Sequence, residues 1–123
     1  MRRLHELKTG RLIGASVECV FHLAGDAQAT RLKDLREFAA ELGVLFQIVD
    51  DILDVTGTDA ALGKPRGSDE RQGKRTYVSV LGLDRARELA TESHGKARAA
   101  LAEAEGETGT LARTTDYILT RRT

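Results

Sequence analysis

The feature that most constrains this chain is the run from about Thr30 to Val55, which contains no proline and one glycine, Gly43. Apolar residues recur through the run at helical spacing, and from Val44 to Val55 they cover most of the circumference of a helix. A helix of that kind has to be an interior helix, because few of its sides suit water. We therefore expect an all-α helical bundle in which this segment is buried.

Helical periodicity also covers most of the remaining sequence, which has one proline, 4% aromatic residues and no alternating strand pattern. The polar, glycine-rich stretch TGTDAALGKPRGSDERQGK is predicted to be a loop, and no repeat or linker divides the chain. We expect a single helical domain over residues 1–123. Its other helices are predicted from Arg2 to about Leu23, from near Asp69 to a break at Gly82, from a cap at Asp84 through the alanine-rich segment, and from about Thr110 to Arg121.

Composition excludes several classes of protein. The 19 basic and 19 acidic residues give a net charge of +0, so nucleic acid is not an expected partner. A run of about 18 apolar residues and a secretion signal are both absent from the sequence, which argues against a transmembrane segment. The single cysteine, Cys19, is predicted to be a buried small hydrophobe, and we expect a cytoplasmic protein.

The segment FQIVDDILD combines an apolar surface with an acidic stripe. At about 100° per residue, Gln47, Asp50, Asp51 and Asp54 occupy an arc of roughly 100° on the helix, and Gly43 falls inside the same arc. Asp50 and Asp54 form a like-charge pair one turn apart, which is unfavourable and grows more so when solvent is excluded. Two interpretations follow: a narrow polar face that meets water, or a site for a cation.

A magnesium site would use such a stripe well. Mg²⁺ prefers carboxylate oxygens, keeps several waters and commonly bridges one or two carboxylates to substrate phosphates. Two cations after the aspartates, Lys64 and Lys74, could face the same phosphates, although an isolated lysine is more often a solvated charge. A nucleotide P-loop does not fit, because five residues separate Gly57 from Gly63 and Pro65 replaces the metal-binding hydroxyl.

Other metal motifs are absent from the sequence as well. The EF-hand pattern is not present around the aspartates, and Cys19 has no partner cysteine. The histidines, His5, His22 and His94, lack ligand spacing, and we expect His22 and His94 to be ordinary surface or partly buried side chains.

Together, HELKTGRLIG, FQIVDDILD and LGKPRGSDERQGKRTY resemble, in this order and spacing, the C-terminal half of the all-α trans-polyprenyl diphosphate synthases of the farnesyl and geranylgeranyl type. The resemblance implies the isoprenoid synthase fold and the head-to-tail condensation of an allylic diphosphate with isopentenyl diphosphate. It implies Mg²⁺ as the cofactor, isoprenyl diphosphates as substrates, and a homodimer or a complementing subunit as partner. It assigns the metal to Asp50, Asp51 and Asp54, with Asp50 and Asp54 foremost, and contacts in the allylic diphosphate site to Lys8, Thr9, Gln47, Lys64 and Lys74.

The sequence also departs from that family. The first aspartate-rich motif, the arginine-bearing segment for the second substrate and the residues that set product length are not found in these 123 residues. We therefore expect half of a site, inactive or nearly so by itself. Three alternatives remain: a non-catalytic module that binds Mg²⁺ and diphosphate or completes a partner's cavity, a fragment of a terpene cyclase, and a purely structural helical bundle. The cyclase is disfavoured because its downstream metal motif is missing from the sequence.

Overall fold

The computed structural model describes residues 6–25, 28–57, 73–105 and 109–122, and the regular elements in these ranges are all helices. They are a short π-helix η1 (Glu6–Gly10), α2 (Arg11–Leu23), α3 (Ala29–Thr56), α6 (Tyr77–Leu81), α7 (Leu83–Glu105) and α8 (Thr110–Thr120). The predicted all-α fold is confirmed. The 28 residues of α3 form the longest helix, about 42 Å from end to end.

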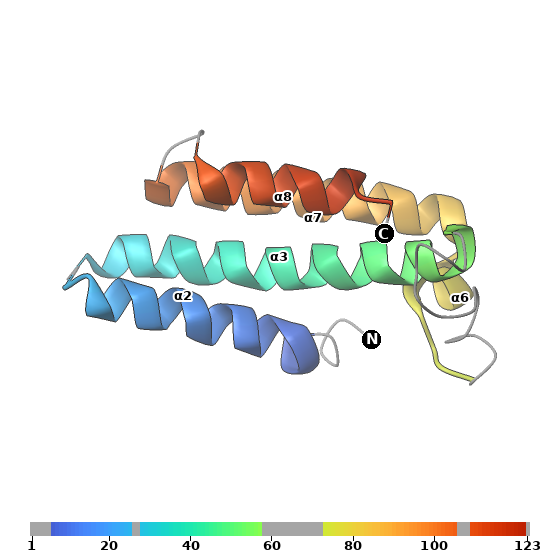
Figure 1. Cartoon of the computed structure of the whole chain (residues 1–123), viewed down its shortest axis with the longest axis horizontal. Coiled ribbons are helices and arrows are strands. Elements are labelled where there is room, and N and C mark those ends of the chain that lie inside the picture. The colour runs from blue at the N-terminus through green and yellow to red at the C-terminus, as the bar shows by residue number, and fades with distance from the viewer. Residues whose placement is uncertain (1–5, 26–27, 58–72, 106–108, 123) are drawn as a thin grey trace.

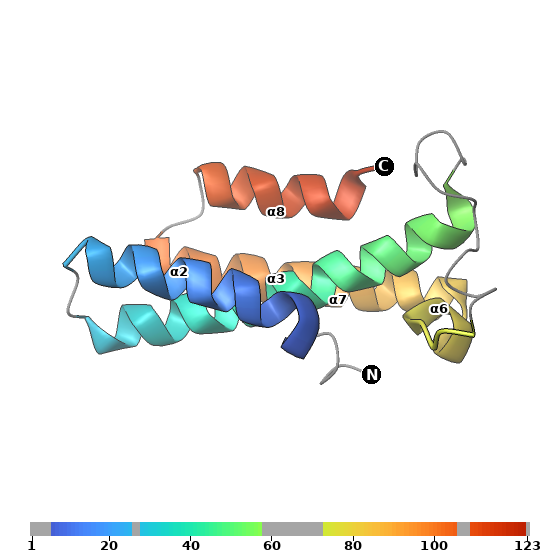
Figure 2. The ribbon, with the colours of Figure 1, turned by 60° about the horizontal axis from the view of Figure 1, so that its bottom comes forward.

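Helix α3 lies at the centre of the bundle, and η1, α2, α6, α7 and α8 all contact it. Figures 1 and 2 show α2 along one side of α3 and α7 along another, and α8 packs against both α7 and α3. The termini of the described chain lie toward the same end of the molecule as the acidic half of α3 (Figure 1). The interior position that periodicity predicts for this helix is confirmed.

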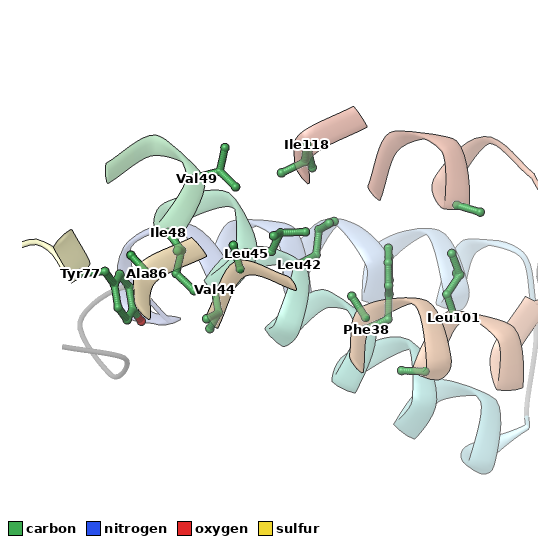
Figure 3. Close-up of a cluster of buried hydrophobic side chains, with 14 of the residues drawn as sticks. Phe38, Leu42, Val44, Leu45, Ile48, Val49, Tyr77, Ala86, Leu101 and Ile118 are labelled. Atoms are coloured by element: carbon green, nitrogen blue, oxygen red, sulfur yellow. The ribbon is translucent and has the colours of Figure 1, made fainter. Parts of the chain in front are cut away.

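In the core, the apolar residues of α3 pack against small residues of α7. Phe38, Leu45 and Ile48 of α3 are at most 1% exposed. They face a row of buried alanines on α7, which lets the two helix backbones approach closely, and Leu101 extends the row. Ile118 closes the cluster from α8, across from Leu42, Leu45 and Val49 of α3 (Figure 3). The charged side chains of α7 point outward, as in the pairs of Arg85 with Glu88 and Glu92.

Three expectations about helix starts are corrected. Helix α7 begins at Leu83, so Asp84 lies in its first turn and does not cap it. Residues 73–76 are not helical, and α6 begins only at Tyr77, because Thr76 caps it: the Thr76 hydroxyl accepts from the Ser79 amide while the Ser79 hydroxyl accepts from the Thr76 amide. Residues 69–72 lie outside the described part. The first predicted helix is not one α-helix either, since Glu6–Gly10 is a wider π-turn that leads into α2; residues 2–5 are not described.

The break at Gly82 is confirmed. Its φ of +82° is a conformation that glycine adopts at little cost, and it turns the chain from α6 into α7. The prediction of Cys19 as a buried side chain is wrong, because it is exposed on α2. Of the α2 side chains, Phe21 is buried, so most of this helix's surface faces away from the core.

Candidate active site

The acidic stripe of α3 is mostly buried. Gln47, Asp51 and Asp54 are 7%, 2% and 1% exposed, whereas the Asp50 side chain is 44% exposed. The interpretation of the stripe as a face that simply meets water is therefore wrong for three of its four members. Carboxylates are buried only where other groups compensate their lost hydration, so this end of α3 has a more specific task than solubility.

Three elements border the stripe. Helix α6 approaches it at Asp51, the end of α8 approaches it at Asp50, and η1 crosses α3 at Gly43. Figure 2 shows η1 beside the middle of α3, with α6 nearer its C-terminal end. Three segments that are separate in sequence therefore contact one polar arc, as expected for a site that the fold assembles.

Both oxygens of Asp51 accept hydrogen bonds from the protein. Gln47 Nε2 donates to Asp51 Oδ1 at 3.0 Å, and the Tyr77 backbone N–H donates to Asp51 Oδ2 at 2.8 Å. The second bond joins residues 26 positions apart and reaches the first turn of α6, where helical N–H groups need a partner from outside the helix. Asp51 therefore ties α6 to α3.

Asp50 is the accessible aspartate of the stripe, and a cation at the end of α8 lies beside it. Arg121 Nη2 lies 4.0 Å from Asp50 Oδ1, and the Arg121 guanidinium stacks on Phe46 with its carbon 4.4 Å from the ring centre. Arg121 directly follows the last residue of α8, in agreement with the expectation that arginines occupy this helix end. Its contact with Asp50 was not predicted.

The segment that carries Lys8 and Thr9 contacts α3 through two glycines, Gly10 and Gly43. A Cβ atom added to Gly43 would lie 2.8 Å from Gly10 Cα, closer than side chains tolerate, so the backbones of η1 and α3 touch here. Lys8 is exposed and Thr9 is half-buried just before this contact. Gly43 and Gln47 are one turn apart on one face of α3, so the structure brings the Lys8–Thr9 segment and the predicted site residue Gln47 to the same helix face.

Of the two lysines that follow the aspartates, Lys74 lies in the described part of the chain. Lys74 is exposed in the non-helical segment 73–76, three residues before the Tyr77 amide that Asp51 holds. Lys64 lies outside the described residues. The structure thus ties one of the two lysine-bearing segments to the acidic stripe.

Within the described ranges, no group of three or more His, Cys, Asp or Glu side chains is arranged to enclose a metal ion. A closed all-protein site is therefore not formed by these residues. Mg²⁺ does not require one, since it binds through one or two carboxylates together with waters and phosphate oxygens. The partly exposed Asp50 fits this open kind of site. Asp51 fits it less well because both its oxygens are engaged, and Asp54, on the same helix face as Asp50, is only 1% exposed.

Hollows elsewhere on the surface do not involve the predicted residues. A cavity of about 310 Å³ lies between α2, α3 and α8, with Val17, Val20, Phe21 and Leu35 in its wall. A shallower one of about 640 Å³ runs along α2 and α3 past Gly10 and Arg36. Beside the first, Leu12, Val20 and Leu23 of α2 are 72%, 68% and 87% exposed, an apolar surface unusual for large aliphatic side chains.

The described histidines behave as expected. His22 is exposed, and His94 Nε2 lies 2.7 Å from Asp116 Oδ1 between α7 and α8, with Arg98 also near this carboxylate. This cluster is part of the α7–α8 contact. None of the helices in the described part of the chain combines the length and apolar character needed to cross a membrane.

The chain is similar in sequence to known proteins. The sequence pattern of the Polyprenyl synthetase family matches residues 1–115. The farnesyl diphosphate synthase of Escherichia coli is 42% identical over 124 positions, which are 98% of this chain and 42% of that protein. The large subunit 1 of a heterodimeric chloroplastic geranylgeranyl pyrophosphate synthase from Arabidopsis thaliana is 40% identical over 95 residues, 77% of this chain and 25% of that one.

The fold has the same relatives. A crystal structure assigned as a farnesyl-diphosphate synthase from Marinomonas sp. MED121 superposes with a TM-score of 0.74 and 30% identity, covering 96% of this chain and 38% of the other. The chain thus spans between a quarter and about two-fifths of the length of these synthases. The central helix of the bundle carries the acidic stripe, the Lys8–Thr9 segment lies against it, and the family pattern matches nearly the whole sequence. This chain therefore belongs to the polyprenyl synthetase family of trans-prenyltransferases.

Proposed function

We propose that this chain supplies the Mg²⁺ and allylic diphosphate side of a prenyltransferase active site that adds isopentenyl diphosphate head to tail. The observation that carries the proposal is the backbone contact between Gly10 and Gly43, since it places the Lys8–Thr9 segment on the helix face that holds Gln47. Among proteins with these motifs, that combination of cations and carboxylates serves a diphosphate leaving group.

Roles can be proposed for the individual residues. Asp50 and Asp54 are the foremost Mg²⁺ ligands, and Asp51 completes the motif. Lys8, Lys64 and Lys74 contact the diphosphate, while Thr9 and Gln47 line the allylic site. When bound, Mg²⁺ would neutralise charge that develops on the leaving diphosphate oxygens. The lysines act on the same charge, and fixed cations stabilise a transition state best where charge increases during reaction.

The site is proposed to need a further part of the synthase. The chain spans between a quarter and about two-fifths of its relatives, and α2 exposes Leu12, Val20 and Leu23. We infer that residues 1–123 form one helical unit of a larger synthase domain, and that this apolar surface is covered by the rest of that domain, in the same polypeptide or in a partner. One relative is named as the large subunit of a heterodimeric synthase, which favours a complementing subunit as the second candidate role. A cytoplasmic location stays a prediction.

Calorimetry with inorganic diphosphate tests the binding role. We expect binding that requires Mg²⁺, and a loss of affinity of about tenfold or more in Asp50→Asn, because a bridging carboxylate is removed. Asp84→Asn is the matched control, since this aspartate is exposed at the start of α7, and it should bind like the wild type. Equal binding by Asp50→Asn and the wild type would reject the assigned metal site.

Turnover separates the two candidate roles. With isopentenyl and dimethylallyl diphosphates and Mg²⁺, we expect the 123-residue chain to form little or no prenyl product by itself. Ready product formation would show that the chain is sufficient and would reject the proposed need for a further part, while supporting the prenyltransferase assignment. Binding without turnover, restored to turnover by a partner that carries the missing synthase region, would favour the subunit role.

A further inference from the structure

Asp51 differs from its neighbour Asp50 in what it contacts. Asp50 keeps a 44% exposed side chain, whereas Asp51 is 2% exposed and each of its oxygens accepts a hydrogen bond from the protein, at 3.0 Å and 2.8 Å. A metal ligand in an open site needs a lone pair directed at the ion and room for water around it. Both oxygens of Asp51 are instead engaged in hydrogen bonds, one from Gln47 and one from the Tyr77 amide.

The Tyr77 amide is the important partner. Tyr77 is the first residue of α6, and its N–H has no carbonyl of its own helix to bond. Its buried ring lies at the end of the core beside Ile48 and Ala86 (Figure 3), so the bond to Asp51 fixes the backbone of a residue that is also held by packing. Thr76 and Ser79 satisfy each other's amides in the same turn. The start of α6 is therefore held at several points.

Lys74 precedes this anchored turn by three residues. A trans peptide chain spans at most about 3.3–3.6 Å per residue, so the place of Lys74 is limited to about 11 Å from Tyr77. Tyr77 in turn is bonded to the residue next to Asp50. The geometry therefore couples the position of a candidate phosphate-binding lysine to the acidic stripe through one carboxylate.

We propose that Asp51 is a positioning residue, whose carboxylate fixes the first turn of α6, and with it Lys74, against α3 beside Asp50. The part of this proposal that concerns diphosphate rests on the proposed function, while the anchoring of α6 does not. Asp51 then acts through Tyr77 and Gln47, and the exposed Asp50 next to it is left to contact the metal.

Amide hydrogen exchange tests the anchor without any ligand. In the wild-type chain we expect the Tyr77 amide to be protected well above the rate of an unstructured peptide. Asp51→Asn should reduce that protection by about tenfold or more, as for a weakened buried hydrogen bond, while Asp50→Asn, the same change one residue away, should leave it within about twofold. A Tyr77 amide that exchanges like free peptide in the folded wild type would overturn the proposal, and this arm needs no variant to fold.

Titration with Mg²⁺ and inorganic diphosphate tests whether Asp51 positions α6 while Asp50 binds the metal. Asp51→Asn should weaken diphosphate binding several-fold and leave the Mg²⁺ concentration for half-maximal binding unchanged, whereas Asp50→Asn should raise that concentration. An equal rise in both variants would make Asp51 a metal ligand and overturn the positioning role. If the wild type binds no diphosphate at all, the proposed function fails, and hydrogen exchange at Tyr77 still decides the anchor.

Discussion

The guanidinium of Arg121 lies over the ring of Phe46, with its carbon 4.4 Å from the ring centre, and so joins the end of α8 to the acidic half of α3. The same guanidinium comes within 4.0 Å of Asp50. Its side chain is only 13% exposed, which strengthens both contacts relative to a fully solvated pair.

Replacement of Arg121 by alanine should therefore lower the free energy of unfolding by about 1 kcal/mol, through loss of the cation–π contact and of the packing of its stem. Arg122→Ala is the control, because Arg122 is exposed next to it, and it should change stability by less than about 0.5 kcal/mol. Urea denaturation of the three proteins measures both values. Equal effects of the two substitutions would show that Arg121 makes no special contribution.

Two glycines should respond oppositely to the same substitution. Gly43→Ala should destabilise the chain by about 1–3 kcal/mol, because the new methyl group would lie 2.8 Å from Gly10 Cα and η1 must move away. Gly95→Ala, inside α7, meets no atom within 4 Å and should stabilise by about 0.5–1 kcal/mol through higher helix propensity.

Thermal denaturation of both alanine variants tests the sign. Under the proposed function, Gly43→Ala should also weaken diphosphate binding, since it displaces the segment that carries Lys8, and Gly95→Ala should not. A stabilising Gly43→Ala would mean that η1 does not touch α3 in solution.

The cap of α6 makes a third prediction. Thr76→Ala should cost about 1 kcal/mol, because it removes the hydroxyl that accepts from the Ser79 amide, whereas Thr76→Ser keeps that oxygen and should recover most of the loss. Chemical denaturation measures both variants. Thr91→Ala is a matched control, since the Thr91 hydroxyl only bonds a carbonyl of its own helix at an exposed position. A Thr76→Ala variant as stable as the control would argue against the capping box.

The pair between Glu18 and Arg36 gives a pH dependence of known sign. Arg36 donates from Nε at 2.7 Å and from Nη2 at 3.0 Å to the two Glu18 oxygens, and these hydrogen bonds lower the pKa of Glu18 below its usual value of 4.5. A lowered folded-state pKa stabilises the fold at neutral pH, and this contribution is lost as the pH falls through that pKa.

Because the side chains of Arg36 and Glu18 are 55% and 35% exposed, the effect of this pair should be small and sensitive to salt. We expect Glu18→Gln to be slightly less stable than the wild type at about pH 7. The difference should shrink as the pH falls below 4.5, the usual pKa of glutamate, and in about 1 M salt. Unfolding measured under the three conditions provides the test. A difference that persists in acid would have to come from packing rather than from charge.

The fold was predictable where periodicity carried the information. The greasy surface of α3 and the break at Gly82 follow from local sequence, and both agree with the structure. The start of α6 did not follow, because the charged residues near Asp69 suggest a helix start while the Thr76–Ser79 capping box decides it. A search for paired hydroxyl residues three positions apart could have located it.

The candidate site was predictable in its residue types and less so in its division of roles. The acidic arc on α3 and the inclusion of Gly43 in it follow from helical geometry. One partner of Asp51, Gln47, belongs to this arc, but the other is a backbone amide 26 residues away, and the pattern of side chains does not reveal a backbone N–H. The approach of Arg121 to Asp50 depends on how α8 docks, which is set by Ile118 and the core and not by any local motif.

Each of the other described elements touches α3, so this helix acts as the hub of the bundle. The surrounding elements have fewer neighbours: α2 mainly contacts α3 and η1, and α8 mainly contacts α3 and α7. Substitutions on α3 itself are felt by several neighbours at once, so its sequence should tolerate the least drift during evolution.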